Sequence, residues 1–201
     1  MNIDKIFSEV SKKLDELDQN REKILNVSRE MIRNCSIAIK SIHRNELSIY
    51  QEKLTQIKSN YKELSNLVDK DTANLSRYLK TPEQEYVEAI CLFAIIHDQS
   101  LPSPEECGVK PINYVLGLAD VIGELRRFIL DKIRRDEFDD LEKYLDIMEN
   151  IYTYLFSLDY PKSITHDLRR KTDVARGIIE KTRGDISLSI QINKFNQKLQ
   201  K

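Results

Sequence analysis

The sequence predicts an all-α protein, built as a single-domain antiparallel bundle of about six to seven long helices. Neither glycine nor proline occurs in the first 81 residues, an absence that favours very long helices. No segment shows the alternating pattern of a β-strand. Apolar side chains instead recur at spacings of 7, 3, 4 and 3, which is typical of a coiled-coil seam. They are Leu25, Ile32, Cys35, Ile39 and Ile42.

The first half of the chain is divided by few helix breakers. We expect one helix over residues 3–43, a turn at "HRNE", and a second helix that ends near residue 79. Pro82 fits the first turn of a third helix, with Thr81 as its N-cap. The segment 98–111 holds three of the five prolines, so we expect it to be the main loop.

The sequence of the second half of the chain predicts three more helices. One follows the main loop and ends near residue 135, and the next spans about 138–158. A long last helix follows "DYPKS", and we expect it to fray beyond Gly184, leaving a loose tail after about residue 190. The whole chain, residues 1–201, is then one all-α domain.

Composition restricts the class of protein. The chain is 40% apolar and 32% charged, and no apolar run approaches the roughly 18 residues that span a bilayer, so we expect no membrane association. Its opening residues lack the pattern of a signal peptide, which predicts a cytoplasmic protein. Cys35, Cys91 and Cys107 show no CxxC spacing, so neither a disulfide framework nor a zinc site is expected.

Two acidic pairs interrupt the two most apolar helical runs. Glu85 and Glu88 lie in "EYVEAICLFAIIH", and Asp120 and Glu124 lie in "INYVLGLADVIGELRR". Spacings of three and four place each pair on one helix face, so both pairs could face the same space. Converging carboxylates repel one another and need a cation. Oxygen ligands without cysteine or histidine favour Mg²⁺ or Mn²⁺, and the four acids are candidate metal ligands and catalytic residues.

Other interpretations of these acids remain open. Acids at helical spacing are common in a chain with 33 of them, and a single pair is usually a solvated surface feature. Arg126 or Arg127 could instead pair with the acids in a structural ion network. A ferritin-like di-iron site is not expected, because it needs Glu-x-x-His and no histidine here follows a glutamate by three residues.

Four segments resemble the signature regions of the translin family. They are "SREMIRNCSIAIKSIHR", "QEYVEA", "INYVLGLADVIGELRR" and "LRRKTDVARGIIEKTRGDISLSI", in the family's order and across nearly the whole chain. The acids resemble those of the translin-associated factor X branch, and the compact length resembles its archaeal single-subunit type. The resemblance implies an all-α fold of about seven helices, a hollow oligomer that is often an octamer, RNA bound inside it, and Glu85, Glu88, Asp120 and Glu124 as a metal-dependent ribonuclease site.

Basic side chains form a second group of candidates. A stripe with spacings of 4, 7 and 4 follows the first helix, in a segment that resembles the family's amino-terminal signature. Such stripes are usually solvated faces, but they also suit phosphate contacts. A second stripe follows the last helix at Arg169, Arg176 and Arg183. The candidate nucleic-acid-binding residues are Arg29, Arg33, Lys40, His43, Arg44 and Arg127.

Three functions follow from these observations. The first is a Mg²⁺- or Mn²⁺-dependent endoribonuclease that acts on single-stranded or nicked RNA. The second is a non-catalytic oligomer that binds single-stranded RNA or DNA. The third is an all-α nucleotide pyrophosphohydrolase, whose acidic pairs follow a similar metal logic.

Self-assembly is expected from apolar seams that a thin bundle would leave exposed. The seam of the last helix consists of Leu168, Ala175, Ile179, Thr182 and Ile186. We therefore expect a closed homo-oligomer.

Overall fold

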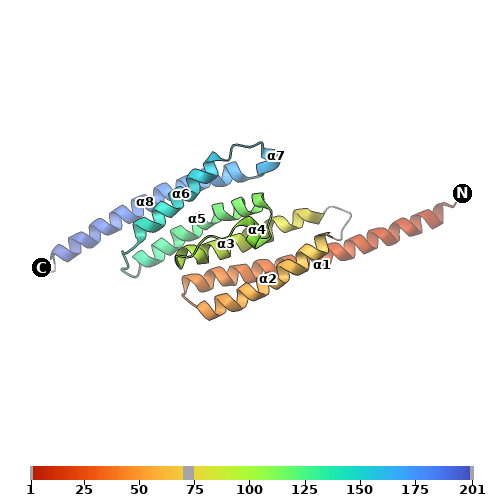
Figure 1. The fold of residues 1–201 in the computed structure, drawn as a ribbon, viewed down its shortest axis with the longest axis horizontal. Coiled ribbons are helices and arrows are strands. Elements are labelled where there is room, and N and C mark those ends of the chain that lie inside the picture. Colours follow the sequence, from red (N-terminus) through yellow and green to blue (C-terminus); the bar gives the residue numbers. More distant parts are fainter. Residues whose placement is uncertain (1, 70–74, 200–201) are drawn as a thin grey trace. The chain divides into compact units, whose positions relative to one another are not determined.

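The computed structural model describes residues 2–69 and 75–199 and contains no strand among them, which confirms the all-α class (Figure 1). Its contacts divide the chain into two compact units, Met1–Tyr86 and Val87–Lys201. Each unit is described by itself below. The assignment of residues 1–201 to a single domain stays a prediction.

The first unit begins with α1, Ile3–His43, which has the predicted bounds. It ends because Asn45 adopts a left-handed conformation, with a φ of 57°. The backbone N–H groups of Asn45 and Glu46 then bond back to the carbonyls of Ile42 and Ser41, at 3.0 and 2.9 Å. These two hydrogen bonds satisfy two carbonyls at the helix end, and the chain turns within three residues.

Helix α2, Leu47–Asp69, packs along α1 and forms the core of the first unit. Ile24, Met31 and Cys35 on α1 are fully buried, as are Ile57 and Leu64 on α2. Each such apolar side chain contributes about 1.5–3 kcal/mol when it leaves water. Of the seam predicted from spacing, Cys35, Ile39 and Ile42 are buried and Leu25 and Ile32 are half-buried, so most of it is an internal contact of the chain.

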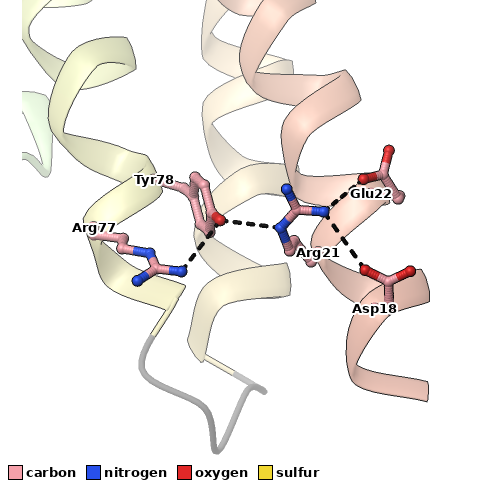
Figure 2. A network of polar contacts seen from close by, with 5 residues as sticks. All are labelled: Asp18, Arg21, Glu22, Arg77 and Tyr78. Carbon is pink, nitrogen blue, oxygen red and sulfur yellow. Dashed lines mark hydrogen bonds and ion pairs between the residues drawn. The ribbon is translucent and has the colours of Figure 1, made fainter. Parts of the chain in front are cut away.

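A polar network joins α1 to the 3₁₀ turn η1, Leu75–Leu79 (Figure 2). Arg21 donates from Nε to the Tyr78 hydroxyl at 3.2 Å, and its Nη1 lies 2.7 Å from Glu22 and 3.5 Å from Asp18. Arg77 donates to the same hydroxyl at 3.3 Å. Hydrogen bonds from Arg77 and Arg21 lower the pKa of Tyr78, because both guanidinium groups favour the phenolate.

The start of α3, Lys80–Ile96, differs from the prediction. Thr81 lies inside the helix and is not its N-cap, because η1 leads directly into α3. Pro82 still lies in the first turn, where a missing N–H costs nothing. The second helix ends at Asp69 rather than near residue 79, and residues 70–74 lie outside the described part of the chain.

The second unit contains the main loop and the remaining helices. A single helical turn, α4 (Pro104–Cys107), interrupts the predicted loop and carries a capping box between Ser103 and Glu106. Helix α5 spans Pro111–Ile133 and α6 spans Leu141–Ser157, close to the predicted bounds. A second short turn, α7 (Lys162–Thr165), precedes the last helix.

Helix α8 spans Leu168–Leu199 and differs from the sequence-based expectations in two ways. It runs without interruption past Gly184 to Leu199, so the expected fraying is wrong. Helices α5, α6 and α8 pack against one another, and this packing buries the α8 seam that we expected at an interface between copies. The five seam side chains are at most 4% exposed: Leu168, Ala175, Ile179, Thr182 and Ile186.

None of the helices within residues 2–69 and 75–199 is long and apolar enough to cross a membrane.

Candidate functional site

The first acidic pair lies on α3, on either side of the boundary between the two units. Glu85 and Glu88 are both half-buried in a helix whose neighbouring residues Tyr86, Val87 and Ala89 are buried. The apolar side chains hold the helix against the core and leave the carboxylates at its margin. The pair therefore occupies one helix face, as its spacing predicted.

The second pair lies on α5, within the second unit. Asp120 forms an ion pair with the ammonium group of Lys171, which comes from α8. Lys171 also donates a hydrogen bond to the carbonyl of Leu116, at 3.2 Å. Its side chain is 15% exposed and that of Asp120 is 38% exposed. The positive charge next to Asp120 is thus supplied by the chain itself, in a partly sheltered position.

Glu124 has an arginine partner one turn along the same helix. Arg127 Nη1 lies 3.5 Å from its carboxylate, and the two side chains are 49% and 24% exposed. Arg126 turns to α8 instead, 2.8 Å from Asp185 and 3.0 Å from the Thr182 hydroxyl. Of the two arginines considered as structural partners of the acids, Arg127 therefore pairs with Glu124 and Arg126 pairs with Asp185.

The fit of a metal ion depends on how many carboxylates converge. Within the described ranges, no group of three or more Asp, Glu, His or Cys side chains is arranged to hold an ion, so the structure shows no preformed four-carboxylate cage. The donor chemistry still suits Mg²⁺, because this ion is often held by one or two carboxylates together with water and substrate phosphates. Asp120 and Glu124, one turn apart on α5, supply such a pair.

A tyrosine links α3, the main loop and α5. Tyr114 donates to the carbonyl of Pro102 at 2.7 Å, and the Cys91 sulfur lies 3.7 Å from its hydroxyl. Burial raises the pKa of Cys91 to about 12 and also raises the pKa of Tyr114. Both groups stay protonated at neutral pH, and their contacts join α3, the main loop and α5 within the second unit.

The basic stripe on α1 faces solvent. Arg29, Arg33, Lys40 and Arg44 are exposed, and no ion pair engages them in the part of the chain that the structure describes. His43 differs, because it is 5% exposed and leaves little of its ring for a phosphate to reach. Of the second stripe, Arg183 lies 2.6 Å from Glu149.

Two residues near the acids were missed from the sequence. Lys171 lies 51 residues from its partner Asp120, so local spacing cannot reveal the pair. Its place beside the seam positions Leu168 and Ala175 was the available signal, since lysines on such margins extend along the buried surface. Glu83 is 1% exposed and accepts a hydrogen bond from Tyr61 at 3.1 Å.

Comparison with known proteins places the chain in one family. The family model described as "Translin family" matches residues 19–184. An uncharacterized protein of Methanocaldococcus jannaschii is 41% identical over 186 residues, which cover 92% of this chain and 82% of the relative. A translin-associated protein X homolog of Schizosaccharomyces pombe is 25% identical over 191 residues, covering 85% of this chain and 81% of the relative.

Solved structures agree with this assignment. A structure of AfC3PO with duplex RNA superposes with a TM-score of 0.82 at 29% identity, over 94% of this chain and 98% of that one. Apo-NeC3PO, at 24% identity, has the same fold, with a TM-score of 0.83 over 91% of this chain and 96% of that one. The signature segments, the helix order and these similarities together show that the chain belongs to the translin family.

Proposed function

We propose that this chain binds RNA as a closed, octamer-type homo-oligomer and cleaves single-stranded or nicked RNA with the help of Mg²⁺ or Mn²⁺. The observation that carries the proposal is the similarity, over nearly the full chain, to a relative whose structure holds duplex RNA. The exposed cations on α1 support it, because unengaged arginines suit phosphate oxygens.

The proposed work of each acid follows from its position. Asp120 and Glu124 are the ligand pair, and Glu85 and Glu88 complete the acidic set from α3. When bound, the ion supplies charge stabilisation at the phosphate and makes an attacking water more acidic. Glu88, at the margin of the apolar core, orients that water. Arg29, Arg33, Lys40 and Arg44 bind the RNA backbone.

A second candidate is a non-catalytic oligomer that binds single-stranded RNA or DNA. The ion pair between Lys171 and Asp120 favours it, because an ammonium group on the carboxylate removes the need for a metal ion. The nucleotide pyrophosphohydrolase hypothesis has lost its basis, since it does not account for a family match that extends far beyond the acids.

The deciding experiment measures cleavage of end-labelled single-stranded, nicked and duplex RNA with Mg²⁺, with Mn²⁺ and with a chelator. Asp120→Asn removes a ligand charge while keeping the side-chain shape. Asp131→Asn is the matched control, because Asp131 lies on the same helix and pairs with Arg134 at 3.2 Å. We expect Asp120→Asn to reduce cleavage at least 100-fold while RNA affinity is preserved, and Asp131→Asn to cleave like the wild type.

Wild-type protein that binds RNA but never cleaves it, with either metal, would favour the non-catalytic oligomer. Cleavage by Asp120→Asn at the wild-type rate would show that the proposed site is not the catalytic site, even if the protein is a nuclease.

A further inference from the structure

Helix α1 carries one continuous heptad seam along almost its whole length. Positions separated alternately by four and three residues lie on one face of a helix and form the contact surface of a coiled coil. Only two of the twelve positions from residue 3 to residue 42 are polar, Arg21 and Ser28. The seam consists of Ile3, Phe7, Val10, Leu14, Leu17, Arg21, Ile24, Ser28, Met31, Cys35, Ala38 and Ile42.

The inner half of this seam is covered within the chain. All six positions from Ile24 to Ile42 are buried, mainly where α2 packs along α1. This cover ends near Asn20, whose side-chain amide lies 3.5 Å from the Leu67 carbonyl in the last turn of α2. At Arg21 the seam turns polar, and its guanidinium is engaged by Tyr78 (Figure 2).

Most of the outer half of the same seam is exposed, and its last position, Leu17, is half-buried. Phe7 is 66% exposed, Leu14 59% and Val10 47%, and Ile6 beside them is 57% exposed. In Figure 1 this amino-terminal part of α1 runs on beyond the end of α2. A stripe of large apolar side chains along four helical turns is costly to leave in water, which favours a contact surface. It also precedes residue 19, where the family match begins.

We propose that the surface formed by Ile3, Phe7, Val10, Leu14 and Leu17 binds the same surface of a second copy of this chain, in a parallel coiled coil. The inference rests on the proposed self-assembly and names one contact that produces it. The heptad places Asp4, Ser11 and Asp18 on one flank of the seam and Ile6, Lys13 and Asn20 on the other.

The flanking charges select the direction of pairing. In a parallel pair the two flanks face each other, so Lys13 of each copy lies next to Asp18 of the other. In an antiparallel pair each flank faces itself, and no combination of these six residues then joins opposite charges. Asp18 is available for this contact, because its side chain is 71% exposed and its link to Arg21 is 3.5 Å long.

The first test weakens the surface without touching the core. The full-length double variant Phe7→Ser/Leu14→Ser changes two exposed side chains, so the fold should be kept. Its circular dichroism spectrum should therefore match that of the wild type. The matched control is Leu188→Ser/Phe195→Ser, which removes two similarly exposed side chains, 59% and 61%, from the end of α8. We expect light scattering at micromolar concentration to show a smaller assembly for the α1 variant only.

Each other outcome has a definite meaning. An equal decrease in assembly size in both variants would overturn the self-pairing of α1. It would indicate that α1 of one copy contacts α8 of another. A wild-type oligomer that neither variant changes would overturn this surface but not self-assembly. A monomeric wild-type protein would overturn both.

The second test detects the parallel register directly. In a parallel pair Leu14 meets Leu14 of the other copy, so Leu14→Cys should form an intermolecular disulfide under mild oxidation. Lys12→Cys, on the opposite helix face, is the control that should not. The native cysteines are buried and do not compete. Equal cross-linking of the two variants would overturn the parallel arrangement.

Discussion

At the scale of single residues, the most informative contact is the ion pair between Lys171 and Asp120. An ammonium group beside a carboxylate has the same electrostatic role as a bound cation, so it stabilises the acid in a half-buried position. Any divalent ion that uses Asp120 must compete with Lys171. The chain therefore sets the metal affinity of the proposed site with its own residue.

Lys171→Met should strengthen metal binding, because the methionine keeps much of the apolar stem and removes the competing charge. A partly sheltered ion pair of this kind is worth about 1 kcal/mol, which corresponds to roughly a fivefold lower dissociation constant for Mn²⁺. Mn²⁺ binding followed by electron paramagnetic resonance measures this without RNA. Lys143→Met, which removes the partner of Asp98, is the control and should leave Mn²⁺ affinity unchanged. Unchanged affinity in Lys171→Met would exclude competition at Asp120.

At the scale of helices, Tyr114 holds the main loop between α3 and α5. Its hydroxyl donates to the carbonyl of Pro102, and the Cys91 sulfur on α3 lies 3.7 Å from the same hydroxyl. Burial raises the pKa of Tyr114 above its ordinary value of 10.0. Above pH 10 the unfolded tyrosine therefore loses its proton while the folded one keeps it, and the folded state loses stability as the pH rises further.

Tyr114→Phe should have two effects on the free energy of unfolding. At pH 7 the loss of the hydroxyl should lower it by about 1 kcal/mol, because the Pro102 carbonyl loses its donor. Between pH 9 and 11 the decline with pH should be shallower than in the wild type, because one group with a raised pKa is gone. Urea titrations across this range measure both. Tyr154→Phe, at a position 74% exposed, should change neither.

The helices could be predicted where local chemistry determines them. The bounds of α1 follow from the absence of glycine and proline and from an asparagine that can adopt a left-handed turn. The start of α3 could not be predicted, since a proline signals a first turn but not the 3₁₀ turn that precedes it. The burial of the α8 seam also depends on α5 and α6, whose packing is not encoded in α8 alone.

In the candidate site, too, local features could be predicted from the sequence and contacts between helices could not. Four acids on two helix faces were found from spacing, because i, i+3 and i, i+4 positions are local geometry. Only some of the ion-pair partners of these acids could be predicted from the sequence. Arg127 lies three residues from Glu124 and was foreseen, whereas Lys171 reaches Asp120 from another helix.

At the scale of the whole molecule, the net charge is −1, so general attraction does not bring RNA to the chain. Binding must use a local surface. The basic stripe on α1 lies on the helix face away from the buried seam, and its four cations fall within about 60° of one another at 100° per residue. An RNA backbone laid along this face could contact all four.

Salt dependence tests this surface. Each phosphate neutralised on single-stranded RNA contributes a slope of about −0.7 to the plot of log affinity against log salt concentration. Arg33→Gln and Arg44→Gln remove exposed guanidinium groups, so each should lower affinity and flatten the slope by roughly that amount. Arg183→Gln is the matched control, because that guanidinium is already engaged by Glu149. Fluorescence anisotropy from 50 to 300 mM salt measures the slopes on RNA and on single-stranded DNA. Equal flattening by all three variants would mean that RNA responds to total charge, and an unchanged slope in the α1 variants would place the RNA on another face.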